Sequence, residues 1–336
     1  MISPRVLIAA TAAVLVAGCG ASSTTAATPK RADGTPALQV VTTVAPITSI
    51  VSQIGGNRIS LHGVVPEGTN SHTYEPPPTV GKLLSRADLV FVNGLKLEDP
   101  TAELASSNAR KGTQVVALGT KSLPESDYIY DFSFPKKDGK PNPHLWTDPL
   151  FAIRYADESA AALTARDPAG AAYYEANRVA FDARATALSD ALKADTATIT
   201  GPKELLTYHD AYAYFGRDYG YTILGAVQPS NFEDPTPKEI ARLIDQVRAE
   251  KVPVIFGSEV FPSKVLKQIG KETGARYEDT LRDDDLPGAP GDKEHSWLGL
   301  MRYDYRTMVK GLGGTTTHLD ALDTTGAVPD TADYPQ

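Results

Sequence analysis

Short apolar runs alternate with helix-like segments in the first half of the chain. The apolar runs cover residues 38–44, 59–65, 88–93 and 114–118, and helical patterns cover 46–54, 79–86 and 150–165. Continuous apolar runs between helices are typical of parallel strands that are buried on both faces. The pattern therefore predicts a first α/β lobe over residues 38–168, built on a parallel sheet.

A long amphipathic helix is predicted after this lobe. Between residues 169 and 198 there is no proline, no glycine follows Gly170, and apolar positions recur at steps of three and four. About 28 residues at about 1.5 Å per residue span about 42 Å. We interpret residues 169–200 as a rigid helix that links two lobes.

The alternation then resumes in a second lobe, residues 201–320. Strands are expected at 203–208, 221–227, 253–257 and 275–280, and helices at 211–219, 237–251, 262–273 and 295–312. The predicted fold is thus α/β, with two parallel-sheet lobes joined by one long helix. Residues 321–336 form a tail.

The amino terminus has the features of an export signal. Arg5 precedes an uncharged, mostly apolar run, 6–17, which is too short to span a bilayer. Small residues then lead to Cys19, the only cysteine, so no disulfide can form within the chain. We interpret 1–18 as a signal peptide and 19–37, rich in Ala, Ser and Thr, as a flexible tether.

The segment Val16-Ala17-Gly18-Cys19 resembles a bacterial lipobox. By this resemblance Cys19 is lipidated and becomes the first residue of the mature protein. Two or three acyl chains would hold the protein on the outer face of the bacterial cytoplasmic membrane. No later segment is long and apolar enough to cross a bilayer, so the lipid is the only membrane contact that we expect.

The charge balance narrows the class of ligand. The chain has 41 acidic and 33 basic residues, and its net charge is −8. This balance argues against nucleic acid as a partner and is compatible with a cation as ligand.

Three histidines and one aspartate lie where ligands of α/β proteins gather. His72, His209 and Asp279 follow or end predicted strands, and His144 lies in a loop that leads into a helix. Open α/β sheets bind ligands at the carboxyl ends of their strands. Neutral imidazoles with a carboxylate suit Zn²⁺, and also Mn²⁺ or Fe²⁺. The sequence therefore predicts one metal site with ligands from both lobes.

The other polar candidates are not predicted to be primary metal ligands. Asp283, Asp284 and Asp285 fall in an acidic loop that we expect to be solvated, although an acidic lip could attract cations. Glu259 follows a strand and could support the ligands or substitute for one. Asp210 could orient His209 or cap the following helix, and we favour capping. The remaining candidates are expected not to be ligands: Glu75, His62, His295 and His318.

Several motifs resemble the metal-binding receptors of bacterial ABC importers called cluster A-I, or cluster 9. The motifs are Ser71-His72-Thr73-Tyr74-Glu75-Pro76, Asn142-Pro143-His144-Leu145-Trp146, and the segments 209–215, 235–240 and 299–303. The resemblance implies two α/β lobes, a rigid linking helix and one metal in the cleft. It implies that the ligands are His72, His144, His209 and Asp279. It also implies a membrane permease and an ATPase as partners, and we expect a monomer.

The identity of the metal is predicted from the third ligand and from the loop before the second ligand. In the family that the chain resembles, the third ligand is a histidine or a glutamate, and glutamate goes with manganese-type receptors. Here it is His209, and three nitrogens with one carboxylate favour zinc. The His-rich loop of many zinc members is absent, since residues 121–143 contain no histidine. A manganese or iron receptor is the alternative.

A zinc-dependent hydrolase and an adhesin lipoprotein are the alternatives from other classes of protein. A zinc-dependent hydrolase would need an open metal position for water and a nearby base. The chain has no His-Glu-x-x-His and no Gly-x-Ser-x-Gly motif, so we do not expect an enzyme. An adhesin lipoprotein would lack a stoichiometric, tight metal site. For a receptor, the ordinary pKa of histidine predicts that metal affinity falls below about pH 6.5.

Overall fold

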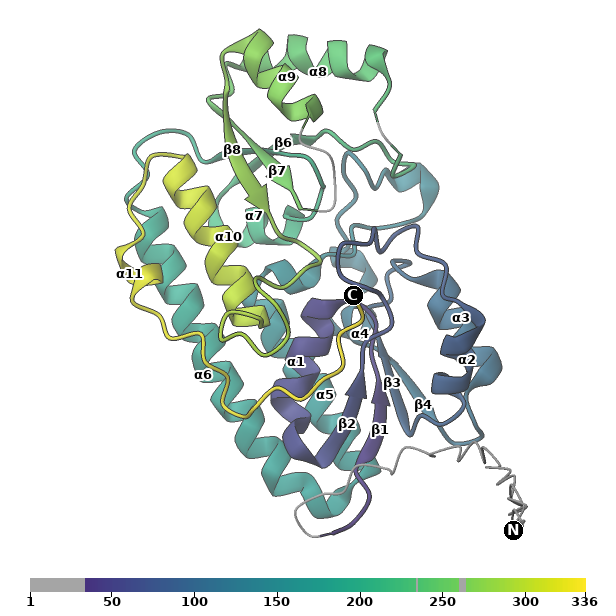
Figure 1. Cartoon of the computed structure of the whole chain (residues 1–336). Coiled ribbons are helices and arrows are strands. Elements are labelled where there is room, and N and C mark those ends of the chain that lie inside the picture. Colours follow the sequence, from purple (N-terminus) through teal and green to yellow (C-terminus); the bar gives the residue numbers. More distant parts are fainter. Residues whose placement is uncertain (1–33, 234, 260–263) are drawn as a thin grey trace, which may run out of the picture.

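Two four-stranded parallel sheets form the centres of two lobes (Figure 1). The structure is a computed structural model, and it describes residues 34–233, 235–259 and 264–336. The strand order is β2-β1-β3-β4 in the first sheet and β6-β5-β7-β8 in the second. All neighbouring strands run parallel. The predicted fold class is therefore confirmed.

The first lobe follows the predicted alternation of strands and helices. Its elements are β1 (Leu38–Val41), α1 (Ala45–Gly55), β2 (Ile59–His62), α2 (Pro78–Leu84), β3 (Leu89–Val92), α3 (Asp99–Asn108), β4 (Gln114–Ala117), α4 (Leu118–Ser122) and α5 (Pro149–Arg166). Every residue of β3 is buried, as expected of a strand covered on both faces. The predicted strand 59–65 is shorter than expected, because β2 ends at His62.

The second lobe has the same architecture. Its elements are β5 (Glu204–Thr207), α7 (Ala213–Tyr219), β6 (Thr222–Ala226), α8 (Pro237–Glu250), β7 (Val254–Ser258), α9 (Lys264–Thr273), β8 (Arg276–Leu281) and α10 (Trp297–Gly311). Helix α8 begins with a capping box in which Thr236 and Glu239 bond each other's backbone N–H groups. The predicted helix 262–273 is α9, whose expected first two residues lie outside the described part of the chain.

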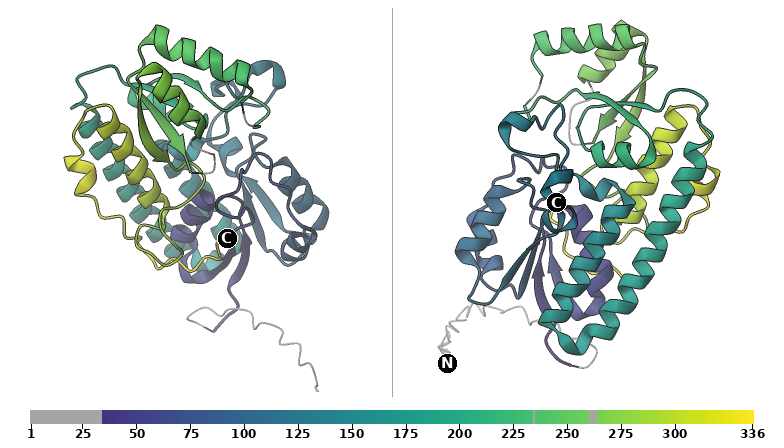
Figure 2. Two further views of the ribbon diagram at one scale, coloured as in Figure 1. Left: turned by 45° about the horizontal axis from the view of Figure 1, so that its top comes forward. Right: turned by 180° about the vertical axis from the view of Figure 1, so that it is seen from behind.

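Helix α6 (Ala171–Thr196) is the predicted long helix, and it extends along both lobes (Figure 2). It contacts α1 and α5 of the first lobe and α10 of the second. Its buried side chains include Tyr174, Phe181, Leu188 and Leu192, which follow the expected helical spacing. The helix is therefore packed against both lobes, and its apolar face joins their cores.

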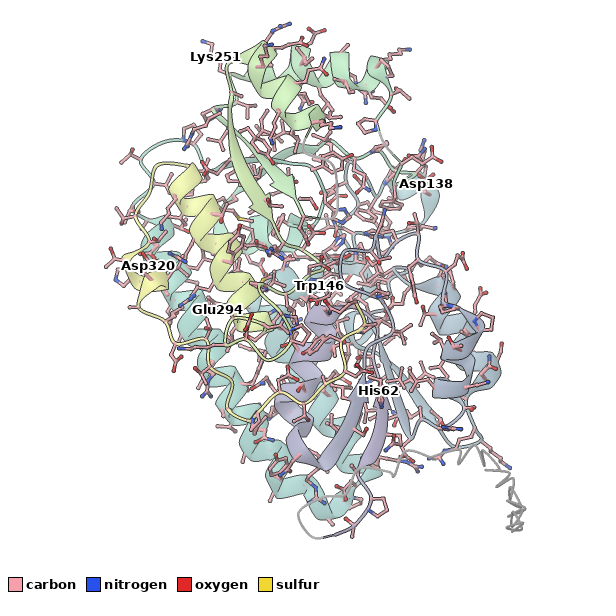
Figure 3. The ribbon with its side chains drawn as sticks, in the orientation of Figure 1. His62, Asp138, Trp146, Lys251, Glu294 and Asp320 are labelled. Atoms are coloured by element: carbon pink, nitrogen blue, oxygen red, sulfur yellow. The ribbon has the colours of Figure 1, made fainter. Side chains whose placement is uncertain are left out.

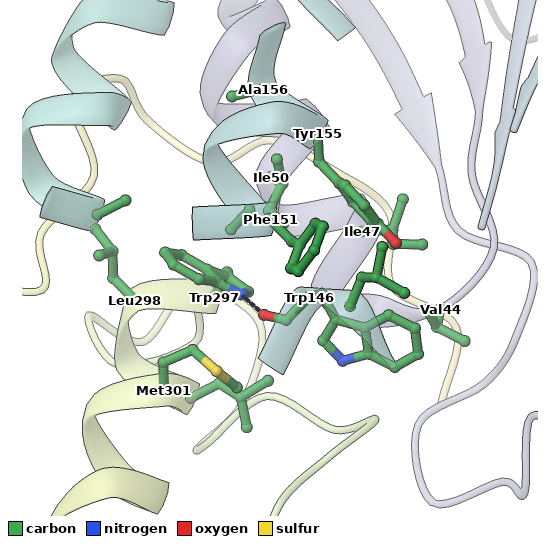
Figure 4. Close-up of a cluster of buried hydrophobic side chains, with 14 of the residues drawn as sticks. Val44, Ile47, Ile50, Trp146, Phe151, Tyr155, Ala156, Trp297, Leu298 and Met301 are labelled. Atoms are coloured by element: carbon green, nitrogen blue, oxygen red, sulfur yellow. Dashed lines mark hydrogen bonds between the residues drawn. The ribbon is translucent and has the colours of Figure 1, made fainter. Parts of the chain in front are cut away.

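Two buried tryptophans join the lobes near their junction (Figure 4). The indole N–H of Trp297, in α10, donates to the carbonyl of Trp146 at 2.8 Å. The indole N–H of Trp146 donates in turn to the carbonyl of Asp283, also at 2.8 Å. Both rings lie in one hydrophobic core that includes side chains of both lobes. This shared core restricts how far the lobes can separate.

The tail after α10 returns to the first lobe. After the short helix α11 (Thr317–Asp320), it passes over the molecule to the side of β2 (Figure 1). There the Asp333 N–H donates to the carbonyl of Leu61, and the Gly63 N–H donates to the carbonyl of Asp333, both at 2.9 Å. The tail thereby covers the exposed edge of the first sheet. Among the described residues, no helix is long and apolar enough to span a membrane.

Candidate metal centre

Three imidazole rings meet between the lobes. Nε2 of His72 lies 3.2 Å from Nε2 of both His144 and His209, and the latter two atoms are 2.9 Å apart. A tetrahedral zinc ion with Zn–N bonds of about 2.0–2.1 Å separates its nitrogen ligands by about 3.3 Å. The three nitrogens therefore have a spacing close to that of ligands on one ion. The structure brings together the three histidines that the sequence predicts.

Each histidine is placed by the end of a strand or the start of a helix. His72 lies in the loop after β2, and His209 lies two residues beyond β5. His144 precedes the turn Leu145–Thr147, which leads directly into α5. Since parallel strands present their carboxyl ends at one edge of the sheet, loops from both sheets converge on the cleft.

The loop that carries His144 is fixed from both sides. Asp148 caps α5, since its Oδ1 accepts the Leu150 N–H at 2.8 Å, and Pro149 occupies the first helical turn, as predicted. On the other side, the amide of Asn93, just after β3, donates to the carbonyl of Pro143 at 2.9 Å. The backbone next to His144 is therefore anchored to a helix and to a central strand.

Side-chain amides set the tautomer of two imidazoles. Nδ1 of His144 lies 2.9 Å from Oδ1 of Asn142, and Nδ1 of His209 lies 2.6 Å from Oε1 of Gln228. The NH₂ group of each amide donates elsewhere, so its oxygen is the acceptor here. Each Nδ1 therefore carries the proton, and each Nε2 directs a lone pair at the centre. Asn142 belongs to a predicted motif, whereas no pattern in the sequence indicated Gln228.

The imidazoles are neutral at physiological pH. Burial lowers the pKa of His209 to about 4, against the opposing effect of its hydrogen bond to Gln228. Burial also lowers the pKa of His72 and of His144 well below the ordinary value, and repulsion from His209 lowers both further. A neutral imidazole is the form that binds a metal ion.

The acidic loop is buried, and the expectation that it is solvated is wrong. Asp283, Asp284 and Asp285 are only 1%, 5% and 8% exposed. Oε1 of Glu259 accepts the backbone N–H groups of all three at 3.1–3.4 Å, and Trp146 holds the carbonyl of Asp283. These contacts fold the loop inward between the lobes. Glu259 thus positions the backbone of the acidic loop.

Two carboxylates of this loop lie beside the imidazoles. Oδ2 of Asp283 is 3.6 Å from Nε2 of His209. Oδ2 of Asp284 accepts the hydroxyl of Ser71 at 2.6 Å, while its buried Oδ1 has no hydrogen-bond partner among the described residues. His144, Asp283 and Asp284 each offer a ligand atom, and these atoms lie within 4.8 Å of one another. The centre thus has a nitrogen side and an oxygen side that share His144.

The carboxyl groups of the oxygen side are costly to ionise in the absence of a cation. Burial, with repulsion from Asp285 as a further cause, raises the pKa of Asp284 to about 7. Burial and repulsion from Glu259 and Asp284 raise the pKa of Asp283 well above its ordinary value. A bound cation relieves this repulsion and desolvation, so the carboxylates favour a cation over an empty site.

Two predicted residues lie outside the part of the chain whose side chains the structure describes. Asp279 belongs to β8, but its side chain is outside the described residues, so its role as a ligand stays a prediction. Cys19, with the predicted signal peptide, falls in residues 1–33, which are also outside that part.

The other predicted non-ligands lie away from the three imidazoles. His62 lies in β2 within the first lobe, while Trp146 marks the junction of the lobes (Figure 3). His62 pairs with Asp333 at 3.3 Å, and His318 pairs with Asp195 at 2.7 Å. Among the described residues, none of the predicted non-ligands joins a metal-binding group: Glu75, His62, His295 and His318.

Asp210 has a different role from the predicted one. Helix α7 begins after Tyr212 without a side-chain cap, so the expectation that Asp210 caps it is wrong. Oδ2 of Asp210 instead accepts the Ser133 N–H at 3.0 Å. It thereby ties the loop of the first lobe to the strand end that carries His209.

Comparison with known proteins identifies the family. Residues 40–311 match the family described as zinc-uptake complex component A, periplasmic. The chain belongs to this family. Its members are metal-binding, substrate-binding lipoproteins of ABC transporters, which act as receptors and not as enzymes.

Proteins that are similar to this chain are named for different metals. The iron-binding protein YfeA of Yersinia pestis is 31% identical over 277 residues, which are 82% of this chain and 86% of YfeA. The manganese-binding lipoprotein MntA of Halalkalibacterium halodurans is 28% identical over 305 residues, 89% of this chain and 95% of MntA. The periplasmic zinc-binding protein TroA of Treponema pallidum has the same fold, with a TM-score of 0.73, 24% identity and coverage of 82% of this chain and 99% of TroA. Membership of the family thus establishes a metal receptor and leaves the metal open.

The pKa values predict two steps in the pH dependence of zinc affinity. Protons compete with zinc for Asp284 as the pH falls through about 7, and for His209 near about pH 4. Competition titrations with a chelator between pH 8 and pH 4 measure both steps. We expect Asp284→Asn to reduce the first step and keep the second. A single step at about pH 6.5 that Asp284→Asn leaves unchanged would contradict this assignment.

Proposed function

We propose that the protein captures a zinc ion outside the cytoplasm and delivers it to the permease of an ABC importer. The observation that carries the proposal is the convergence of three neutral imidazole nitrogens, 2.9–3.2 Å apart, from loops of both lobes. Imidazole is a preferred ligand of zinc, and a buried, closed shell of ligands suits capture better than catalysis.

The ligand set that we propose is His72, His144, His209 and one carboxylate. The positions of Asp283 and Asp284 beside the imidazoles support one of these two as the oxygen ligand. Asp279 is the alternative, from the resemblance of the chain to the family. Three nitrogens and one oxygen in a tetrahedral arrangement favour zinc.

Manganese or iron is the second candidate, and the paired carboxylates favour it. If Asp283 and Asp284 both bind the ion, the shell has two oxygens and more than four ligands. Such a shell suits Mn²⁺ and Fe²⁺ better than a tetrahedral one does. The names of the manganese-binding and iron-binding relatives also support this candidate.

Delivery requires an anchor, partners and a release step. We propose that lipidated Cys19 and the tether 19–37 hold the receptor on the outer face of the cytoplasmic membrane. The body then docks as a monomer on the permease, whose ATPase drives import. Because the shared core restricts hinge opening, movements of the ligand loops release the ion.

The first test is metal content and competition. Protein purified without added metal should contain about one zinc ion per chain by elemental analysis, because the site is preformed and rich in imidazole. In a calorimetric competition, zinc should displace manganese. Because zinc binds most such sites more tightly than manganese, metal content is the deciding result: one manganese or iron ion per chain in place of zinc would favour the second candidate, and no stoichiometric metal would contradict a receptor.

His72→Ala tests whether the imidazoles form the site. Loss of a direct ligand should lower zinc affinity by more than about 100-fold, the upper effect of removing an outer-shell partner. His318→Ala is the matched control, because His318 is 59% exposed and pairs with Asp195 elsewhere. Equal affinity of the two variants would remove His72 from the site.

A set of three alanine variants identifies the oxygen ligand. We expect Asp283→Ala or Asp284→Ala to lower zinc affinity by at least about tenfold, because each removes a carboxylate beside the imidazoles. If Asp279→Ala alone has this effect, the ligand is Asp279 and the buried loop only supports the site. Circular dichroism of each variant verifies that the fold is intact before affinities are compared.

A further inference from the structure

His72 is oriented differently from the other two imidazoles. His144 and His209 each bond a side-chain amide through Nδ1, at 2.9 and 2.6 Å. Among the described residues, the hydrogen-bond contacts of the His72 ring involve only Nε2. Its ring instead lies flat against the ring of Phe232, with centroids 4.2 Å apart and an angle of 1° between the planes. The orientation of His72 therefore depends on a ring contact.

This contact crosses the cleft. His72 belongs to the first lobe, while Phe232 lies between β6 and α8 of the second. A second aromatic ring, Phe134, has its centroid 5.5 Å from both. The two phenylalanines thus form an apolar wall beside the imidazoles, since Phe134 also contacts the ring of His144 at 5.6 Å.

The backbone of Phe232 is held in an unusual conformation. Its φ angle is +59°, a left-handed value that bulky residues rarely adopt. Its N–H donates to the carbonyl of Pro229 at 2.9 Å. Its carbonyl accepts the amide of Gln228 at 3.3 Å and that of Asn70 at 3.5 Å.

These partners connect Phe232 to both sides of the metal centre. Gln228 is the residue that orients His209. Asn70 belongs to the loop of His72, and its Oδ1 accepts the His72 N–H at 3.1 Å. The conformation of Phe232 is therefore coupled to the loops of two ligands, one from each lobe.

We infer that Phe232 positions His72 and keeps the site closed over the bound ion. Binding of a divalent cation at Nε2 withdraws electron density from the imidazole ring. The electron-rich face of a phenylalanine attracts an electron-poor ring more strongly. The stack thus stabilises the loaded site more than the empty one, and movement of Phe232 away from His72 opens a path for the ion. This inference rests on the proposed function, because it concerns the ion that the histidines hold.

The test is the rate of zinc release. Zinc-loaded protein is mixed with excess EDTA in a stopped-flow instrument, and release is followed with a zinc-sensitive dye. We expect Phe232→Ala to release zinc about tenfold faster, since most changes within one interface act on dissociation. Phe232→Leu keeps a branched apolar side chain, although a smaller one, without the aromatic face and should also release faster. Phe232→Tyr keeps the face and should restore slow release.

Two further variants distinguish the effect of the Phe232 ring from the effect of its backbone conformation and from nonspecific effects of losing an aromatic ring. Phe232→Gly removes the ring and also the steric objection to a positive φ, so fast release in both Gly and Ala variants assigns the effect to the ring. Slow release in Phe232→Gly would assign it to the backbone and overturn the inference. Phe132→Ala is the matched control, since its ring is 52% exposed, and it should release at the wild-type rate.

The outcomes distinguish the inference from the proposed function. One-to-one zinc binding by the wild-type protein, with release from Phe232→Ala and Phe232→Leu within about twofold of it, would overturn the role of Phe232 alone. Absence of zinc binding by the wild-type protein would overturn the proposed function, and the inference with it. Fast release from the Ala and Leu variants with rescue by Tyr supports both.

Discussion

Three imidazole nitrogens within 3.2 Å of one another in a buried cleft impose a charge state on the whole centre. Protonated rings would repel one another and lose hydration, so burial holds all three neutral. Beside them, burial and mutual repulsion raise the pKa values of the carboxyl groups of Asp283 and Asp284. A divalent cation resolves both problems, because it accepts the nitrogen lone pairs and neutralises the carboxylates. The centre is thus expected to be most stable when it holds a divalent cation.

The scaffold keeps these groups together by linking the ligand loops to a continuous core. Trp297 fixes the backbone at Trp146, and Trp146 fixes the loop of Asp283. Helix α6 packs along both lobes, so a wide hinge motion would expose apolar surface. Small loop movements do not carry that cost. The site can therefore be pre-organised for binding and still open locally.

Much of this could be predicted from the sequence, and the limits have physical causes. The apolar run of β3 and the helical spacing in α6 are local patterns, and each predicts its element directly. His72, His144 and His209 are recognisable because each lies in a loop that follows a predicted strand or leads into a predicted helix. The acidic loop gave no such signal, since three aspartates among glycines and prolines resemble a solvated turn. Its burial depends on Trp146 and Glu259, which are distant in sequence. Gln228 and Phe232 were missed for the same reason, because their roles come only from tertiary contacts.

The central claim is that one ion is bound by three imidazole nitrogens and at least one carboxylate oxygen. X-ray absorption spectroscopy of the zinc-loaded protein measures the ligands of the ion directly. The account predicts a first shell of three nitrogens with the outer-ring scattering of three imidazoles, plus one or two oxygens, at about 2.0–2.2 Å. A spectrum with one imidazole or none, or with a shell made only of oxygens, would contradict it.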